Sequence, residues 1–383
     1  DRRSGLFFEA DSQALLLIDW LRRGGNACEL EVLRLNHGGT CIDEALRELS
    51  VLGGDRSHVG DEASCSESDA GAAACPTLDP VVSLALNVSG DCNLSCDYCY
   101  LGSGSRLEGG QMSERTAFAA VDLLFAESFG EKELAVVFFG GEPLLNLDLI
   151  ETVAHRARER AEAEGRRLSL RMTTNGTLLT ADVFQSLRSA GISVLVSVDG
   201  PRPVHDAHRA FPDGSGSYDG VAENLRAIVC RGLLADGTNG RLKARATVTE
   251  DSGPLPEVVS HLRGMGFSTV YLSPVSGPDM SREFAKRLCN NFESLARLEL
   301  EALLEDGRPT VGNFLEPILA LEVGRKRMRP CGAGTHYVSV AHDGRLFLCH
   351  RFAGDPAFAV GDVDRGLDRR ATARLLRRFE RPA

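Results

Sequence analysis

The stretch DCNLSCDYCY, Asp91–Tyr100, places three cysteines within ten residues. Three residues separate Cys92 from Cys96, and two separate Cys96 from Cys99. Thiolates gathered in one loop bind either a tetrahedral zinc ion or an iron–sulfur cluster. A zinc site takes four ligands, and the next downstream histidine is distant, at His155. A cubane cluster held by these three thiolates would leave one iron open to a small molecule. The alternatives are a zinc knuckle and thiols that bind no metal.

Strand-like and helix-like segments alternate around this motif, from about residue 80 to residue 300. Six apolar strands that are each followed by a helix predict an α/β fold in which a parallel sheet curves into a partial (β/α)6 barrel. Functional residues of such folds lie at the carboxyl ends of the strands. The expected strands are 81–89, 134–141, 168–176, 193–200, 241–249 and 269–275, and the expected helices are 113–129, 148–165, 180–191, 218–234 and 255–266.

Short polar motifs follow these strands in order. CNLSCDYC comes after the first strand, GGEP after the second, TTNG after the third, SVDG after the fourth, TVTE after the fifth and SPV after the sixth. Each motif alone could be a plain turn, because Asn and Asp before glycine are common turn formers. Their occurrence in barrel order favours one shared site.

On these residues the chain resembles the radical S-adenosylmethionine (SAM) enzymes. Their fingerprint has the same cysteine spacing with an aromatic residue before the last cysteine, here Tyr98. The resemblance implies a [4Fe–4S] cluster on Cys92, Cys96 and Cys99, whose open iron takes the amino nitrogen and carboxylate of SAM. One-electron reduction of the sulfonium then gives methionine and a 5′-deoxyadenosyl radical, which abstracts hydrogen from the substrate.

The resemblance also implies which residues bind SAM. The GGEP motif corresponds to the family motif that binds the methionine ammonium, since glycine permits close backbone approach and a carboxylate complements a cation. Residues of TTNG and SVDG should approach the ribose and the methionine carboxylate, and an arginine in HDAHR should meet that carboxylate. The implied cofactor-binding residues are Tyr98, Gly140, Gly141, Glu142, Pro143, Thr174, Asn175, Ser197, Asp199 and Arg209.

A second cysteine pair, Cys331 and Cys349, flanks a predicted hairpin whose turn is Asp343-Gly344. This region resembles the opening of a SPASM domain, which in full form binds two auxiliary [4Fe–4S] clusters through about seven cysteines. Only the first two are present, so we expect either a missing C-terminal segment or a member that has lost clusters. We expect both cysteines to be buried and to bind an auxiliary cluster, of which the chain would hold one or two. We interpret His350 as a surface imidazole.

The domain organisation follows from these patterns. Residues 1–55 read as a small α/β module resembling winged-helix peptide-recognition elements, in which the segment LFFEAD could pair with a leader peptide as an edge strand. Residues 56–79 read as a linker, 80–300 as the radical SAM barrel, and 301–383 as an apparently incomplete SPASM domain.

Within the SPASM group, GSYDGVAENL, CGAGTHYVSV and LFLCHRFAGD look most like the SCIFF-type maturases and the maturation proteins of quinohemoprotein amine dehydrogenase. That resemblance implies intrapeptide thioether bonds from a cysteine sulfur to a carbon of Asp, Glu or Thr. Sulfatase-maturing relatives, which form formylglycine, typically carry Asp-His-Phe where this chain has His350-Arg351-Phe352. Formylglycine formation and a non-catalytic peptide-binding barrel remain the alternatives.

Composition restricts the partners. The net charge of −11 disfavours nucleic acid, whose phosphates need Lys and Arg, and no apolar run approaches the length of a membrane span. We expect a cytoplasmic enzyme that uses a peptide substrate with a leader and an electron donor such as flavodoxin or ferredoxin. The basic run 365–381 is predicted to form a solvated helix face. The cysteines that match no motif are Cys28, Cys41, Cys65, Cys75, Cys230 and Cys289.

Overall fold

The computed structural model describes residues 80–102, 109–234, 242–275, 280–306, 309–322 and 331–379. The chain forms two compact units, one of residues 1–75 with 326–330 and one of residues 76–325 with 331–383. All of the described residues lie in the second unit. The expected recognition module and linker therefore lie outside the described residues, and the domain boundaries stay predictions.

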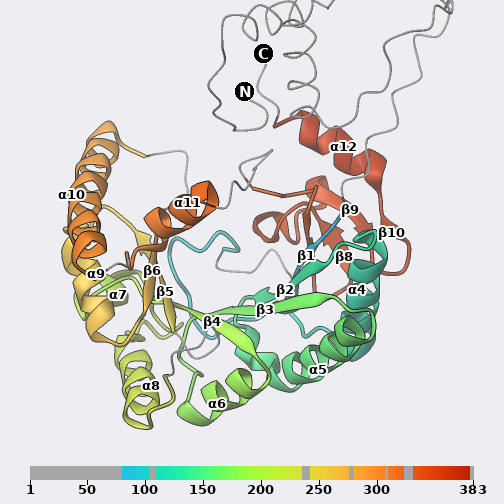
Figure 1. The fold of residues 1–383 in the computed structure, drawn as a ribbon, viewed down its shortest axis with the longest axis horizontal. Helices are drawn as coiled ribbons and strands as arrows, with labels where there is room; N and C mark the ends of the chain where they lie inside the picture. Colours follow the sequence, from blue (N-terminus) through green and yellow to red (C-terminus); the bar gives the residue numbers. More distant parts are fainter. Residues whose placement is uncertain are drawn as a thin grey trace, which may run out of the picture. The chain divides into compact units, whose positions relative to one another are not determined.

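Six parallel strands form the centre of the described unit, and they pair in the order of the sequence (Figure 1). Each expected strand is present within one or two residues of its predicted start, so the prediction of a parallel α/β sheet is confirmed. The strands are β1 (Ser83–Ser89), β2 (Glu133–Gly140), β3 (Arg167–Thr174), β4 (Ile192–Ser197), β5 (Lys243–Val248) and β6 (Thr269–Pro274).

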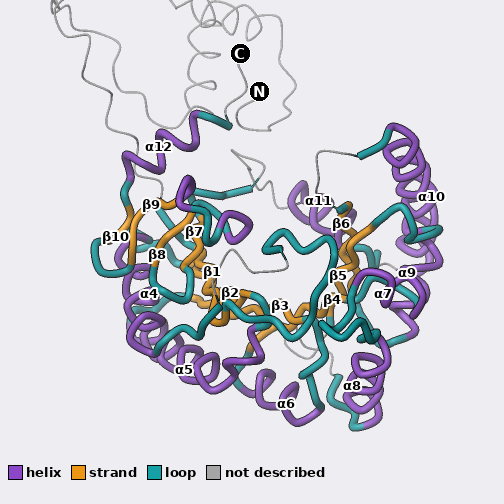
Figure 2. Tube along the Cα trace, turned by 180° about the vertical axis from the view of Figure 1, so that it is seen from behind, coloured by secondary structure: helices purple, strands orange, loops and turns teal. Residues whose placement is uncertain are grey.

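Helices cover the outer, convex side of this curved sheet (Figure 2). Each of the five expected helices forms, because apolar residues recur every three or four positions and bury one face against the strands. In the helix after β2, for example, the buried positions include Ile150, Val153, Ala154 and Ala157. The helices are α4 (Glu114–Glu127), α5 (Leu147–Ala163), α6 (Ala181–Ser189), α8 (Tyr218–Cys230) and α9 (Leu255–Gly264).

Two short elements were not expected. A 3-10 helix, η1 (Pro143–Asn146), follows β2, and a short helix, α7 (Arg202–His208), separates β4 from α8. Pro203 lies in the first turn of α7, where a missing N–H costs nothing because the first turn has no intrahelical acceptors. Only His205 is buried in α7, so the sequence of this helix has no apolar periodicity that would predict it.

Side chains alternate along each strand between the two faces of the sheet. On β5, Ala244, Ala246 and Val248 are buried on one face, whereas Arg245 and Thr247 point to the other and line a cavity. The same two-residue period places Phe139 of β2, Thr173 of β3, Ser197 of β4 and Ser273 of β6 in that cavity. The inner face near the carboxyl ends of the strands therefore forms the site.

Two glycines allow the cysteine loop to start directly against the end of β2. Gly140 has φ +136°, and a Cβ there would lie 2.2 Å from the carbonyl oxygen of Ser89. A Cβ on Gly141 would lie 2.3 Å from the carbonyl oxygen of Asp91. Instead, the Gly141 N–H donates to the Ser89 carbonyl at 2.9 Å and the Glu142 N–H donates to the Asp91 carbonyl at 2.9 Å. The GGEP motif therefore needs glycine at these two positions for backbone packing, whatever it binds.

The C-terminal strands extend the same sheet beyond β1. β7 (Tyr337–Val340) pairs in parallel with β1, and β8 (Arg345–Phe347), β9 (Ala359–Asp362) and β10 (Gly366–Leu367) follow antiparallel. The predicted hairpin is therefore confirmed as β7 and β8. The side chain of Asn87 on β1 donates to the Val340 carbonyl oxygen at 2.8 Å, which ties the hairpin to the barrel.

The remaining elements lie after β6 and at the chain end. The long helix α10 (Arg282–Asp306) follows β6, and α11 (Gly312–Glu322) comes next. Two 3-10 helices, η2 (His350–Phe352) and η3 (Pro356–Phe358), follow β8, and α12 (Arg369–Arg377) ends the described chain. Exposed arginines on α12 confirm the solvated basic face. Among the described helices, none combines the length and the apolar character that crossing a bilayer requires.

Candidate active site

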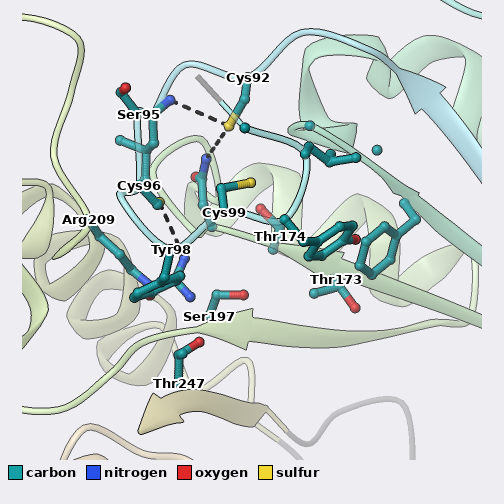
Figure 3. Close-up of a pocket in the computed structure, with 18 of the residues that line it drawn as sticks. Cys92, Ser95, Cys96, Tyr98, Cys99, Thr173, Thr174, Ser197, Arg209 and Thr247 are labelled. Atoms are coloured by element: carbon teal, nitrogen blue, oxygen red, sulfur yellow. Dashed lines mark hydrogen bonds between the residues drawn. The ribbon is translucent and has the colours of Figure 1, made fainter. Parts of the chain in front are cut away.

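One cavity of about 490 Å³ opens at the carboxyl ends of the strands (Figure 3). It gathers the cysteine loop and residues from all six parallel strands or the loops that follow them. Ten of the thirteen barrel residues predicted from the sequence line it: Cys92, Cys96, Tyr98, Cys99, Gly140, Gly141, Thr174, Asn175, Ser197 and Arg209. Glu142, Pro143 and Asp199 are not lining residues, and the hairpin cysteines Cys331 and Cys349 are not either.

The three loop cysteines are free thiols on the wall of this cavity. Burial raises the pKa of Cys92, and it raises the pKa of Cys96 to about 11. Donors nevertheless point at these sulfurs: the Leu94 N–H lies 3.4 Å from Cys92 Sγ, and Arg209 Nη1 lies 3.9 Å from Cys96 Sγ. Thiols with nearby donors become stable thiolates once a cation binds them.

An iron–sulfur cluster fits this set of residues. Among the described residues, no three side chains of His, Cys, Asp or Glu lie close enough together to hold a single metal ion. Three thiols spread along one cavity wall suit a polynuclear cluster, in which each thiolate binds a different iron. The role of Cys92, Cys96 and Cys99 as cluster ligands remains a prediction that this arrangement supports.

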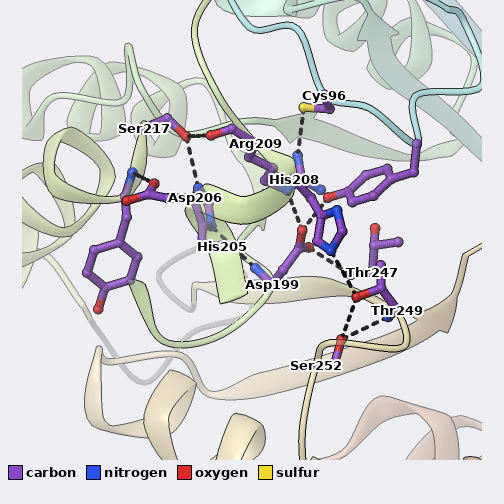
Figure 4. A network of polar contacts seen from close by, with 12 residues as sticks. Cys96, Asp199, His205, Asp206, His208, Arg209, Ser217, Thr247, Thr249 and Ser252 are labelled. Atoms are coloured by element: carbon purple, nitrogen blue, oxygen red, sulfur yellow. Dashed lines mark hydrogen bonds and ion pairs between the residues drawn. The ribbon is translucent and has the colours of Figure 1, made fainter. Parts of the chain in front are cut away.

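The cysteine loop is held in place by the residues that end α7. The Ser95 N–H donates to the Ala210 carbonyl at 2.8 Å. His208 Nδ1 pairs with Asp97 Oδ2 at 2.8 Å, while its Nε2 lies 3.1 Å from the Thr249 hydroxyl (Figure 4). His208 thus joins the loop to the end of β5. Sequence reasoning gave no role to Asp97 and His208, although both lie in quoted motifs, because their contact joins residues 111 positions apart.

Asp199 organises a buried network under the cavity floor. Its Oδ2 accepts from Arg209 Nε at 3.0 Å and from the Tyr98 hydroxyl, and its Oδ1 accepts from the Thr247 N–H at 2.8 Å. Asp199 is 1% and Arg209 8% exposed. Burial alone would lower the pKa of Arg209, but Asp199 holds that pKa above its usual value. The guanidinium is therefore fixed beside Cys96 as a permanent charge.

A neutral histidine supports this network from behind. His205 Nδ1 accepts from the Asp199 N–H at 3.4 Å, and its Nε2 lies 2.9 Å from the Ser217 hydroxyl. Ser217 in turn donates to the Arg209 carbonyl oxygen at 2.8 Å. Burial, and then the charge of Arg209, lowers the pKa of His205 to about 4. The ring stays uncharged near neutral pH and orients the backbone that carries Asp199 and Arg209.

Glu142 lies beneath the cavity wall, fully buried. Its Oε1 accepts from the Thr174 hydroxyl at 2.7 Å and from the Leu144 N–H at 3.0 Å, and its Oε2 accepts from the Asn175 N–H at 2.7 Å. The carboxylate thus joins the ends of β2 and β3. Its predicted contact with the methionine ammonium remains a prediction, as do the predicted roles of Pro143 and Asp199.

The position of Glu142 predicts a dependence of stability on pH. Burial raises the pKa of its carboxyl from 4.5 to about 7, although the Asn175, Thr174 and Leu144 donors favour the ionised form. The folded protein therefore holds this proton more tightly than the unfolded chain. Its contribution to stability is complete below about pH 4.5 and is lost as the pH rises through about 7.

We expect the free energy of unfolding of the wild type, without SAM, to fall relative to that of Glu142→Gln across this pH window. Urea titrations at several pH values measure it. Parallel pH profiles for the two proteins would contradict the raised pKa.

The other half of the cavity was not predicted from the sequence. Tyr100, Phe139 and Arg245 line it together with His350 and Arg351. The signal that could have found Arg245 is its position, since a charged residue between two buried alanines on β5 must face the inside of the barrel.

The interpretation of His350 as a surface imidazole is wrong. Its ring packs 4.5 Å from the Phe139 ring centroid and bonds to the Tyr337 hydroxyl through Nδ1. Burial, followed by the charges of Arg351 and Arg245, lowers its pKa to about 4. His350 is therefore a neutral wall residue of the cavity.

The two hairpin cysteines lie close to each other but differ in exposure. Cys331 is exposed, against the expectation of a buried pair, and lies six residues before β7 begins. Cys349 is half-buried, and burial, with a smaller contribution from Cys331, raises its pKa. Two thiols supply half of the four ligands that a [4Fe–4S] cluster takes, so an auxiliary cluster here remains a prediction.

Part of the barrel matches a known protein family. Residues 86–240 match the model of the Radical SAM superfamily. Over these residues the chain is similar to the radical SAM superfamily. The matched segment contains the three loop cysteines, the GGEP, TTNG and SVDG motifs, and Arg209.

Relatives at the sequence level are of several kinds. A protein of Archaeoglobus fulgidus without a characterised function is 30% identical over 285 residues, 71% of this chain and 62% of the relative. The radical SAM cyclopropyl synthase TigE of Paramaledivibacter caminithermalis is 27% identical, over 40% of this chain and 34% of its own. An AdoMet-dependent heme synthase of Methanosarcina barkeri is 36% identical over 34% of each chain. The chain thus spans less than two thirds of each of these relatives.

A similar fold is found in solved structures. The structure of native anSMEcpe with bound AdoMet and the Kp18Cys peptide aligns with a TM-score of 0.63 and 18% identity, over 76% of this chain and 80% of that chain. This likeness supports the fold and nothing finer.

Proposed function

We propose that this protein is a radical SAM enzyme that modifies a peptide by joining a cysteine sulfur to a carbon of Asp, Glu or Thr in a thioether bond. The observation that carries the enzymatic part is the convergence of Cys92, Cys96 and Cys99 with the strand-end residues in one cavity. A bound [4Fe–4S] cluster and SAM would supply an organic radical for hydrogen abstraction.

The residues of the chain would then serve to bind and orient. Cys92, Cys96 and Cys99 would hold the cluster, and Arg209 would hold an anionic group of SAM beside Cys96. Gly140 and Gly141 line the cavity and would present their backbone to SAM.

Peptide modification is supported by three observations of different strength. The hairpin motifs resemble those of thioether maturases. Residues just after Cys349 line the same cavity as the cysteine loop, so a substrate thiol held near the hairpin would face the barrel interior. The fold is similar to that of anSMEcpe, which was crystallised with a peptide. An auxiliary cluster on Cys331 and Cys349 would need further ligands.

The test uses anaerobically reconstituted full-length protein, SAM, a reductant and synthetic peptides that carry one cysteine with an Asp, Glu or Thr acceptor. A thioether appears in the mass spectrum as the loss of two hydrogens and protects the sulfur from alkylation. Formylglycine formation would instead replace the thiol by an aldehyde, which supports the sulfatase-type alternative. Absence of any SAM cleavage would leave the non-catalytic peptide-binding barrel.

A second candidate is modification of a tetrapyrrole. It is favoured by the identity of 36% to the heme synthase of Methanosarcina barkeri. Incubation of the reconstituted protein with an iron coproporphyrin, followed by chromatography of the pigment, distinguishes this activity from peptide modification.

A further inference from the structure

Three polar side chains form a closed ring of hydrogen bonds beside the cysteine loop. Asn93 belongs to that loop, and Asn175 and Thr177 come directly after β3. Asn175 Nδ2 donates to Asn93 Oδ1 at 2.8 Å, and Asn93 Nδ2 donates to the Thr177 hydroxyl at 2.8 Å. The Thr177 hydroxyl donates in turn to Asn175 Oδ1 at 2.7 Å. Each member both donates and accepts, so the three contacts are mutually consistent.

The ring fixes the direction in which the amide of Asn175 faces. Its oxygen also lies 3.0 Å from the Thr177 N–H, and a backbone N–H can only donate, so the atom there must be Oδ1. Nδ2 then faces the cysteine loop, where it lies 3.8 Å from Cys92 Sγ. Asn175 is only 7% exposed, so its amide has little freedom to turn toward water. Together with the Leu94 N–H, it gives the Cys92 sulfur two hydrogen-bond donors (Figure 3).

The hydrogen-bonding capacity of the Asn175 side chain is fully used by these contacts. A side-chain amide has two N–H donors and an oxygen that accepts two hydrogen bonds. The donors are directed to Asn93 and Cys92, and the oxygen accepts from the N–H and the hydroxyl of Thr177. A contact of this amide with SAM, which the family resemblance implies, would therefore break one of the four hydrogen bonds.

We propose that Asn175 is a positioning residue that donates a hydrogen bond to the Cys92 thiolate and thereby raises the reduction potential of the cluster bound there. This inference rests on the proposed function, because that function supplies the cluster. An electron taken up from a one-electron reductant adds negative charge that the cluster shares with its cysteine sulfurs. An N–H aimed at such a sulfur stabilises the reduced form more than the oxidised form.

The test is the midpoint potential of the reconstituted full chain, measured without SAM and without peptide. A redox titration followed by electron paramagnetic resonance measures it. Asn175→Asp keeps the shape of the side chain and the acceptor for Thr177, but it removes the donor to Cys92. We expect the potential to fall by about 59 mV more than in the control below, which is a tenfold change in a one-electron equilibrium. Asn175→Ala removes the donor without adding a charge, and the potential should fall here too.

The matched control is Asn93→Asp, which adds the same charge to the same ring. It removes the donor to Thr177, whereas its oxygen can still accept from Asn175, whose other N–H stays on Cys92. Asn93→Ala is the corresponding control for Asn175→Ala. Equal shifts within each pair would mean that Asn175 only holds the loop, and they would overturn the proposal. The resonance signal comes only from chains that hold the cluster, so partial loading of a variant does not obscure the shift.

The outcomes separate this inference from the proposed function. Wild type and Asn175→Asp that both bind iron and share one potential would overturn the inference alone. Weaker SAM binding by Asn175→Asp with an unchanged potential would assign the amide to SAM and overturn it as well. A wild type that takes up no iron and sulfide would overturn both. The expected shift without any thioether product would reject the proposed peptide modification and leave the role of Asn175 in place.

Discussion

Replacing Cys92, Cys96 and Cys99 together by alanine is expected to remove about four iron atoms per chain from anaerobically reconstituted protein. The physical reason is that these three thiols line one cavity and are the cluster ligands that the described barrel offers. Reductive cleavage of SAM should be abolished at the same time. Iron and acid-labile sulfide analysis, beside an assay for 5′-deoxyadenosine, measures both.

The control for this experiment is the double variant Cys230→Ala with Cys289→Ala. Both cysteines are exposed and lie on helices away from the cavity. Iron content and cleavage should match those of the wild type. A triple variant that keeps its full iron content would show that the cluster, if present, is held elsewhere.

Replacing Asp199 by alanine is expected to lower the free energy of unfolding by about 3–5 kcal/mol, because it leaves the buried guanidinium of Arg209 without its partner. The same change removes the acceptor of the Tyr98 hydroxyl and of the Thr247 N–H. The cysteine loop and the carboxyl end of β5 then lose the carboxylate that hydrogen-bonds to both. Urea denaturation of the purified chain measures the change.

An exposed pair provides the comparison. Arg202 and Asp219 form an ion pair on the surface between α7 and α8, with side chains 57% and 65% exposed. Asp219→Ala should cost less than about 1 kcal/mol, because water screens the pair and solvates the remaining charge. Similar losses for Asp199→Ala and Asp219→Ala would contradict the assigned role of the buried network.

The order of strands and helices could be predicted because the barrel repeats one pattern. Apolar strands and amphipathic helices alternate, and the strand-end motifs follow in order, so the parallel sheet and ten lining residues were identified in advance. The cysteine spacing alone pointed to Cys92, Cys96 and Cys99. Local signals of this kind depend on residues that are neighbours in the sequence.

The missed features depend on residues that are distant in the sequence. His350 was taken for a surface residue because its neighbours give no sign that Phe139 and Tyr337 pack around it. The parallel pairing of β7 with β1 joins residues more than 250 positions apart. Arg245 and Arg351 meet only because that pairing brings the hairpin beside the barrel mouth.

Exposure of Cys331 shows a further limit. Free cysteine is commonly buried, which led to the expectation of a buried pair, but Cys331 lies six residues before β7 and is exposed. Whether a side chain at the end of a strand is covered depends on segments that pack from elsewhere. The sequence pattern of a single hairpin cannot contain that information.

The central claim is that this cavity generates a radical from SAM. The most direct measurement is the formation of 5′-deoxyadenosine and methionine by anaerobically reconstituted wild-type protein, with and without a one-electron reductant. The account predicts both products in equal amounts, only with reductant and only while the three loop cysteines are intact. Protein that carries its full iron content, yet leaves SAM uncleaved in the presence of reductant, would contradict it.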